Sequence, residues 1–123
     1  MSYGAYKRVQ SASATNDARD MEYRLLAQVT GGLIRAQEGK GTLQDRLNAI
    51  LRNEKVWTVF LEEMNDEANP FPKSLKQGIA KLALFVMKET QLVLNSEEPL
   101  DDLININRQI MAGLKPEPAT LAG

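Results

Sequence analysis

The sequence of 123 residues contains neither cysteine nor histidine. Without cysteine there is no disulfide bond and no thiol nucleophile, and the usual zinc, haem and iron–sulfur ligand sets are missing. Without histidine there is no Ser-His or Cys-His catalytic pair, and the commonest general acid–base group is absent. These absences predict that the protein is not an enzyme and that it holds no metal or other cofactor.

The chain also lacks an excess of charge of one sign and any long apolar run. Its 15 Lys and Arg residues and 16 Asp and Glu residues give a net charge of −1. Nucleic-acid binding requires clustered basic residues, so this balance argues against it. No apolar stretch approaches the roughly 18 residues that span a membrane, and Met1–Arg8 does not resemble a signal peptide. We therefore expect a cytoplasmic protein without membrane insertion.

Proline and glycine separate the helical segments of the chain. Gly39-Lys40-Gly41 ends the first predicted helix, because glycine readily adopts the left-handed conformation of a helix end. Thr42 and Asp45 have the spacing of a capping box at the start of the second helix. Pro72 suits the start of the third helix, and Gly113 is expected to end the fourth. The predicted helices cover residues 17–38, 42–64, 72–94 and 99–112.

No segment shows the alternation of a β-strand. We therefore predict an all-α protein, a compact bundle of four main helices packed in an antiparallel or partly splayed arrangement. Residues 1–16 are expected to form an N-terminal arm, flexible or only locally helical. Residues 17–114 form the helical domain, and residues 115–123 form a flexible tail that contains two prolines.

Apolar residues form stripes on the predicted helices, and some helices have more than one stripe. The expected core stripe of the first helix is Ala18, Met21, Leu25, Val29, Leu33 and Ala36, and a second stripe is Tyr23, Ala27, Thr30 and Ile34. The expected core stripe of the second helix is Leu43, Leu47, Ile50, Trp57, Leu61 and Met64, with Val56, Val59 and Phe60 standing off it. In the third helix Leu84 lies away from the stripe of Leu75, Ile79, Leu82, Val86 and Val93.

The apolar residues outside the core stripes allow two interpretations. In the first, the third helix is central and the arm folds back over a spare stripe with Tyr3 and Tyr6. In the second, the spare stripes receive an amphipathic helix from a partner protein. Composition alone favours the first, because isolated exposed apolar residues are common on soluble proteins.

Three polar residues, Glu22, Glu54 and Asn107, fall inside the core stripes. Paired carboxylates can carry out acid–base chemistry, but the chain supplies no nucleophile, metal site or phosphate loop to go with them. We therefore expect both glutamates to be structural and to bond partners such as Arg108 or Asn53, since an unpaired buried charge is costly.

Four segments in order resemble the FlaF family of flagellar biosynthesis regulators. The first is Glu22–Thr30, and the second is Leu51–Phe60, which carries an Asn-x-x-x-Trp-x-x-Phe pattern. The third is Leu75–Thr90, and the fourth is Leu103–Leu114. The resemblance implies a small cytoplasmic helical protein that is not an enzyme. It also implies a role as a flagellin export chaperone that is needed for flagellin production and secretion, in bacteria that pair FlaF with the regulator FlbT.

The family provides no established functional residues, so the predicted binding site comes from the spare stripes. The expected partner is the terminal amphipathic helices of flagellin, and the predicted contacts are Tyr23, Ile34, Val56, Val59, Phe60 and Leu84. Two alternatives stay open. The protein would be an adaptor of flagellin synthesis that acts through FlbT, or a post-transcriptional regulator that binds flagellin mRNA through the lysine face of the third helix. That face comprises Lys73, Lys76, Lys81 and Lys88, and the simpler interpretation is a solvated surface.

Overall fold

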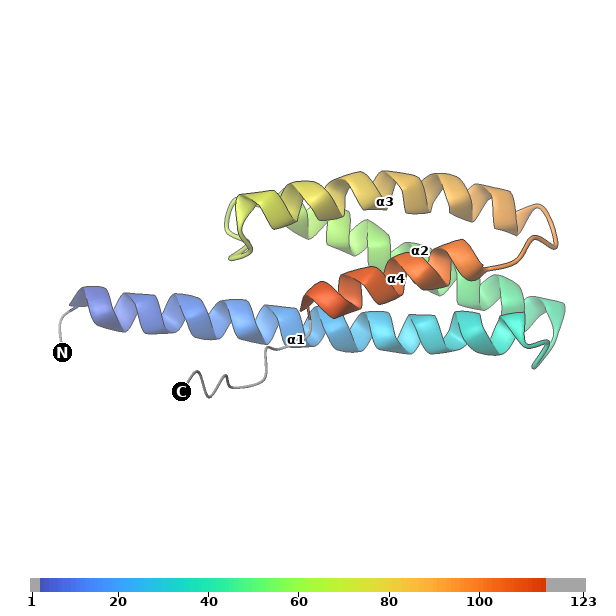
Figure 1. Ribbon diagram of the computed structural model, residues 1–123, viewed down its shortest axis with the longest axis horizontal. Helices are drawn as coiled ribbons and strands as arrows, with labels where there is room; N and C mark the ends of the chain where they lie inside the picture. Colours follow the sequence, from blue (N-terminus) through green and yellow to red (C-terminus); the bar gives the residue numbers. More distant parts are fainter. Residues whose placement is uncertain (1–2, 115–123) are drawn as a thin grey trace.

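The protein is a bundle of four helices (Figure 1). The computed structural model describes the backbone of residues 3–114 and the side chains of residue 17 and residues 19–114, and no strand occurs among them. The helices are α1 (Tyr3–Gln37), α2 (Leu43–Met64), α3 (Lys73–Leu94) and α4 (Asp101–Leu114). The predicted fold class is therefore confirmed.

The turn between α1 and α2 has the predicted form. Gly39 and Gly41 adopt φ angles of 74° and 99°, in the left-handed region that favours glycine. The Asp45 amide donates to the Thr42 hydroxyl at 3.2 Å, and the Thr42 amide donates to the Asp45 carboxylate at 2.8 Å. The backbone hydrogen bond from Thr42 lowers the pKa of Asp45, because it stabilises the charged carboxylate. The capping box is confirmed.

The predicted arm is wrong in conformation, because residues 3–16 form the first turns of α1. No proline occurs before Pro70, so nothing in this segment interrupts the helix, and its small and polar residues are compatible with one. Figure 1 shows that this part of α1 extends beyond the other helices and does not fold back along them. The predicted tail at residues 115–123 lies outside the described residues.

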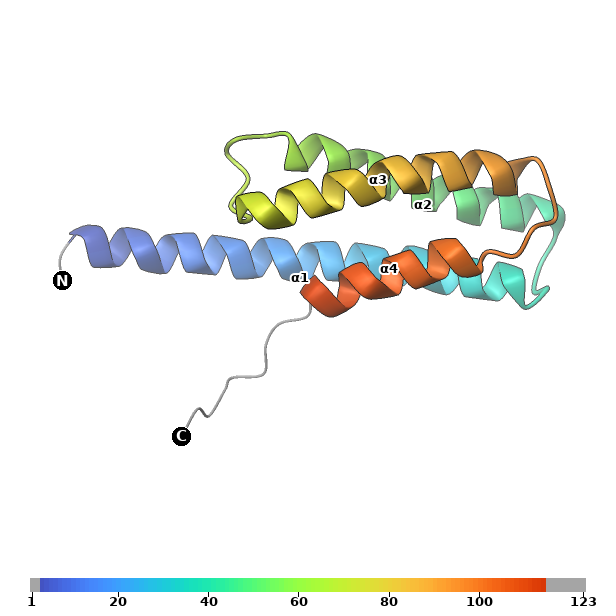
Figure 2. The ribbon, with the colours of Figure 1, turned by 45° about the horizontal axis from the view of Figure 1, so that its top comes forward.

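The four helices alternate in direction, and each is in contact with its two neighbours in a ring, α1–α2–α3–α4–α1. Gln37 joins the end of α1 to the start of α4. Its side-chain oxygen accepts from the Leu100 amide at 2.6 Å, and its nitrogen donates to Asp101 at 2.7 Å. In Figure 2, α4 lies along only the second half of α1. Gly113 does not end α4 as predicted, since the helix continues to Leu114.

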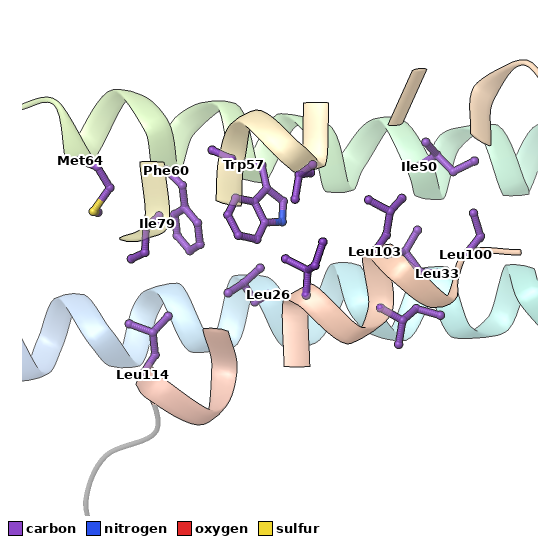
Figure 3. Packing of buried hydrophobic residues seen from close by; sticks show 14 of the residues in the cluster. Leu26, Leu33, Ile50, Trp57, Phe60, Met64, Ile79, Leu100, Leu103 and Leu114 are labelled. Carbon is purple, nitrogen blue, oxygen red and sulfur yellow. The ribbon is translucent and has the colours of Figure 1, made fainter. Parts of the chain in front are cut away.

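The centre of the bundle is closed by large side chains from all four helices (Figure 3). Trp57 and Phe60 point inward from α2, with ring centroids 5.6 Å apart in an edge-to-face arrangement. Phe60 is only 1% exposed. The prediction that Phe60 stands off the core is therefore wrong. The core face of α2 is broader than the narrow stripe that was expected, since it includes both Trp57 and Phe60.

The buried face of α1 lies between the two stripes that were predicted. Leu33 of the expected core stripe is fully buried, as predicted. Thr30 of the supposed spare stripe is buried, and its hydroxyl lies 3.9 Å from the sulfur of Met111 on α4. Met21 and Leu25 of the supposed core stripe are 62% and 37% exposed. The core face of α1 is turned by one position because α4 covers the side that carries Thr30.

A buried polar network connects α1, α2 and α4 around Asn107. The indole nitrogen of Trp57 donates to the Asn107 oxygen at 2.8 Å. The Asn107 nitrogen donates to Thr30 at 3.0 Å and to the oxygen of Asn53 at 2.7 Å. The expected burial of Asn107 is confirmed. Low polarity around these groups strengthens their hydrogen bonds and makes a missing partner costly.

Gly78 on α3 provides a test of helix propensity that is separate from packing. A Cβ atom added there would meet nothing within 4 Å. Gly78→Ala is therefore expected to raise the free energy of unfolding by about 0.5–1 kcal/mol, because alanine loses less backbone entropy on forming a helix. Urea denaturation measures the gain. Gly39→Ala is the matched control and should destabilise the protein, since its φ of 74° strains any residue with a Cβ.

A candidate partner-binding furrow along α1

Three adjoining hollows form a furrow along one side of α1. The largest, of about 640 Å³, lies between α1 and α2. Gln28 lines both this hollow and a second one of about 280 Å³. Asp17 and Met21 line both the second and a third, of about 330 Å³, which reaches the loop between α2 and α3. Because neighbouring hollows share residues, they make one continuous surface, which we call the α1 furrow.

The packing of α1 against α2 determines the shape of the furrow. Gly32 has no side chain, and a Cβ atom built on it would lie 3.7 Å from the Cβ of Ala49. Two small residues at this crossing let the helices approach and leave the surface above them open. The atoms nearest to a Cβ atom built on Gly31 or Gly32 belong to the side chains of Arg35 and Ala49, so among the described residues no backbone of another helix packs closely against this pair.

The middle of the furrow exposes apolar side chains. Met21 and Leu25 lie on α1 one helical turn apart and line the second hollow. The helices are antiparallel, with Gly32 beside Ala49 and Glu22 beside Glu63, so Leu25 lies level with Val56 and Val59 of α2. Val59 is 38% exposed, and Val56 is half-buried against the core. An open helix pair with apolar side chains in its groove is suited to receive a further helix.

The six predicted contact residues do not lie on one surface. Tyr23 and Ile34 are half-buried against the core, on the stripe of Thr30 that faces α4. Phe60 is in the core. Leu84 is 66% exposed, as its position on the polar side of α3 predicted. Val56 and Val59 lie beside the furrow on α2.

Met21 and Leu25 are the exposed residues that the sequence interpretation missed. Both were assigned to the core because they fit a regular apolar stripe. The available signal was the stripe of Tyr23, Ala27, Thr30 and Ile34, which competes for the same role. Where apolar residues occupy two sides of a helix, the sequence alone does not show which of them the neighbouring helices cover.

At one end of the furrow two carboxyl groups share a buried position. Glu22 on α1 is 5% exposed, and its pKa is raised to about 9, first by burial and then by the hydrogen bond to and the charge of Glu63 on α2. The Oε2 atom of each group is buried and has no hydrogen-bond partner among the described residues. The predicted arginine or amide partner of Glu22 is therefore wrong, and Glu54 is only half-buried. Protonation of Glu22 replaces an ion pair as the means of avoiding a buried charge.

Glu22→Gln is expected to remove a pH-dependent loss of stability. The unfolded carboxyl has its ordinary pKa of 4.5, whereas the folded one has a pKa of about 9. In the range between these values the folded protein keeps a proton that the unfolded chain has lost, so the free energy of unfolding falls as the pH rises through that range. The neutral amide escapes this fall. Near the upper end of this pH range the free energy of unfolding of the variant should exceed that of the wild type by about 1–3 kcal/mol. Near the lower end the two proteins should be equally stable.

Urea denaturation at several pH values checks this result. Glu62→Gln changes an exposed carboxylate next to Glu63 in the sequence and should keep the wild-type pH dependence. A Glu22→Gln protein whose stability falls with pH as the wild type's does would contradict the assignment.

The fold and the α1 furrow together define the class of protein. It is a small all-α bundle with an exposed furrow along one helix. In the part of the chain that the structure describes, no group of acidic residues is arranged to hold a metal ion, and no helix is long and apolar enough to cross a membrane. The sequence model of one family, described as Flagellar protein FlaF, matches residues 2–114. The chain belongs to the FlaF family and is a flagellar protein. No curated protein and no solved structure matches it significantly.

Proposed function

We propose that this FlaF-family protein is a cytoplasmic export chaperone that binds flagellin and supports its production and secretion. The observation that carries the proposal is the α1 furrow, in which Met21 and Leu25 are exposed on α1, with the exposed Val59 at the level of Leu25 on α2. The terminal regions of flagellin are amphipathic segments that stay unpaired until assembly. An apolar helix face that is left unpaired favours premature association, and covering it prevents this.

The size of the exposed surface suits a partner that must later be released. The furrow offers a few apolar anchors rather than a long continuous interface, and a small number of anchors carries most of the energy of an interface. Moderate affinity follows, which allows the client to leave when export begins. This proposal has no catalytic step and needs no cofactor.

Size-exclusion chromatography with light scattering tests the proposal directly. The purified protein is run alone, with monomeric flagellin, and with flagellin lacking its terminal regions. A complex of defined mass with full-length flagellin, lost on truncation, is the expected result. Absence of a complex with full-length flagellin, while the protein alone is folded, would contradict direct binding.

A second candidate is an adaptor that acts through FlbT. It is favoured by a second exposed apolar surface, formed on α3 by Leu84, Phe85 and Leu92. Lys81 and Lys88 are exposed on the same helix, so the surface has both apolar and basic character. If the complex with flagellin forms only when FlbT is added, the adaptor function replaces the chaperone function.

A further inference from the structure

The α1 furrow changes charge from one end to the other. The hollow at the C-terminal end of α1 is lined by three cations, Arg35, Lys40 and Arg52, and by one carboxylate, Asp45. The hollow at the opposite end is lined by four carboxyl groups and no cation. Those groups are Asp17, Glu22, Glu63 and Asp66. Leu25 lies between the two ends, in a middle hollow that also contains the Asp20–Arg24 ion pair, and Met21 lines both this hollow and the acidic one.

The cations at the basic end are available to a partner. The Asp45 carboxylate accepts a hydrogen bond from the Thr42 amide at 2.8 Å. The Lys40 amine forms an ion pair with the Glu38 carboxylate at 3.0 Å. Among the described side chains, Arg35 and Arg52 form no ion pair, and both are exposed. Two free guanidinium groups therefore face the end of the furrow, where they would favour carboxylates or the carbonyl end of a helix.

The acidic end of the furrow stays acidic when the contacts of its side chains within the protein are considered. Burial raises the pKa of Glu22, so the acidic side chains counted at this end are Asp17, Glu63 and Asp66. The Lys76 amine donates to the backbone oxygen of Asp66 at 3.1 Å and not to its carboxylate. The Asp66 carboxylate accepts from the Ala68 amide at 2.9 Å. This end would favour the amide end of a helix or basic side chains.

We propose that the α1 furrow binds one amphipathic helix in a single direction, with its N-terminus at the acidic end and its C-terminus at the basic end, parallel to α1. The inference rests on the proposed function in that it takes the furrow as the site of a partner helix. The distance from Asp17 to Arg35 along α1 is about 27 Å, which corresponds to a bound helix of about 18 residues. The partner therefore carries an apolar stripe along its length and acidic residues in its last turns. In the opposite direction, its carbonyl end would lie against three carboxylates.

The absence of cysteine in the chain makes the direction measurable by disulfide cross-linking. Asn48→Cys places a thiol at the basic end, and Ala68→Cys places one at the acidic end; both positions are exposed and line the furrow. The probe is a synthetic amphipathic peptide of about 18 residues, with a leucine stripe, two glutamates in its last turn, and one cysteine at either end. Each protein variant is mixed with each peptide, and the yield of mixed disulfide is measured.

The expected result is a preference of about fivefold or more for two pairings. The C-terminal cysteine should link to Asn48→Cys, and the N-terminal cysteine should link to Ala68→Cys. Arg35→Glu with Arg52→Glu, added to the Asn48→Cys protein, should remove the preference. Equal yields, the reversed pattern, or no cross-linking at either position would overturn the inference.

The same variants are mixed with flagellin in parallel, so that the two proposals are judged separately. A directed peptide without flagellin binding would support the polarity of the furrow and reject the chaperone function. Flagellin binding with an undirected peptide would support the chaperone function and reject the polarity.

Discussion

Leu25→Glu combined with Val59→Glu lowers the affinity for flagellin by about a hundredfold in our expectation. Leu25 lines the furrow and Val59 lies at the same level on α2, so each substitution places a charge at a proposed apolar anchor, and loss of one such anchor costs about 1–2 kcal/mol. Since 1.4 kcal/mol corresponds to a factor of ten, two anchors give an effect of about this size. Both side chains are more than a third exposed, so the bundle should stay folded. Isothermal titration calorimetry with monomeric flagellin measures the change.

Leu84→Glu combined with Leu92→Glu is the matched control. It changes two exposed residues on α3 in the same way and lies away from the furrow. We expect it to leave flagellin binding unchanged within about a factor of two. Loss of binding in the α3 pair, with normal binding in the furrow pair, would place the flagellin site on α3 and contradict the furrow.

Asn107→Ala should destabilise the protein by about 3–5 kcal/mol. The substitution leaves a cavity between three helices and removes the partner of Trp57, Thr30 and Asn53 together. An unsatisfied buried group costs about 1–3 kcal/mol, and a domain of this size has only about 5–15 kcal/mol of net stability. Thermal and urea denaturation followed by circular dichroism measure the loss.

The comparison that isolates the network is Asn105→Ala, on the exposed side of α4. It changes the same residue type in the same helix and should cost less than about 0.5 kcal/mol. If both variants were equally stable, the polar network would contribute nothing that packing does not already supply.

The helix boundaries followed from the sequence because they depend on neighbouring residues. Thr42 and Asp45 form their hydrogen bonds across three positions, and Gly39 supplies a conformation that other residues adopt at a cost. The error at residues 3–16 has the same origin. A polar segment without a breaker is compatible with helix or arm, and the sequence contains no local signal that distinguishes them.

Which side of a helix is buried could not be predicted from neighbouring residues in the same way. In α1 the pairs Leu25-Leu26 and Val29-Thr30 place candidate core residues on adjacent positions, about 100° apart around the helix. Which member is buried depends on where α4 lies, and α4 is separated from α1 in sequence by two other helices. The contact between Thr30 and Asn107 spans 77 positions. No local pattern predicts it.

The sequence by itself determined the all-α class, the four helices with most of their ends, and the family, since propensity, capping and segment order are properties of the chain. Only the tertiary structure decided that Phe60 lies in the core and that Met21 and Leu25 are exposed. It also decided that the carboxyl groups of Glu22 and Glu63 lie in contact. The physical reason is that burial belongs to pairs of helices. A side chain is covered only when another element is placed over it, and that placement is the combined result of contacts distant in sequence.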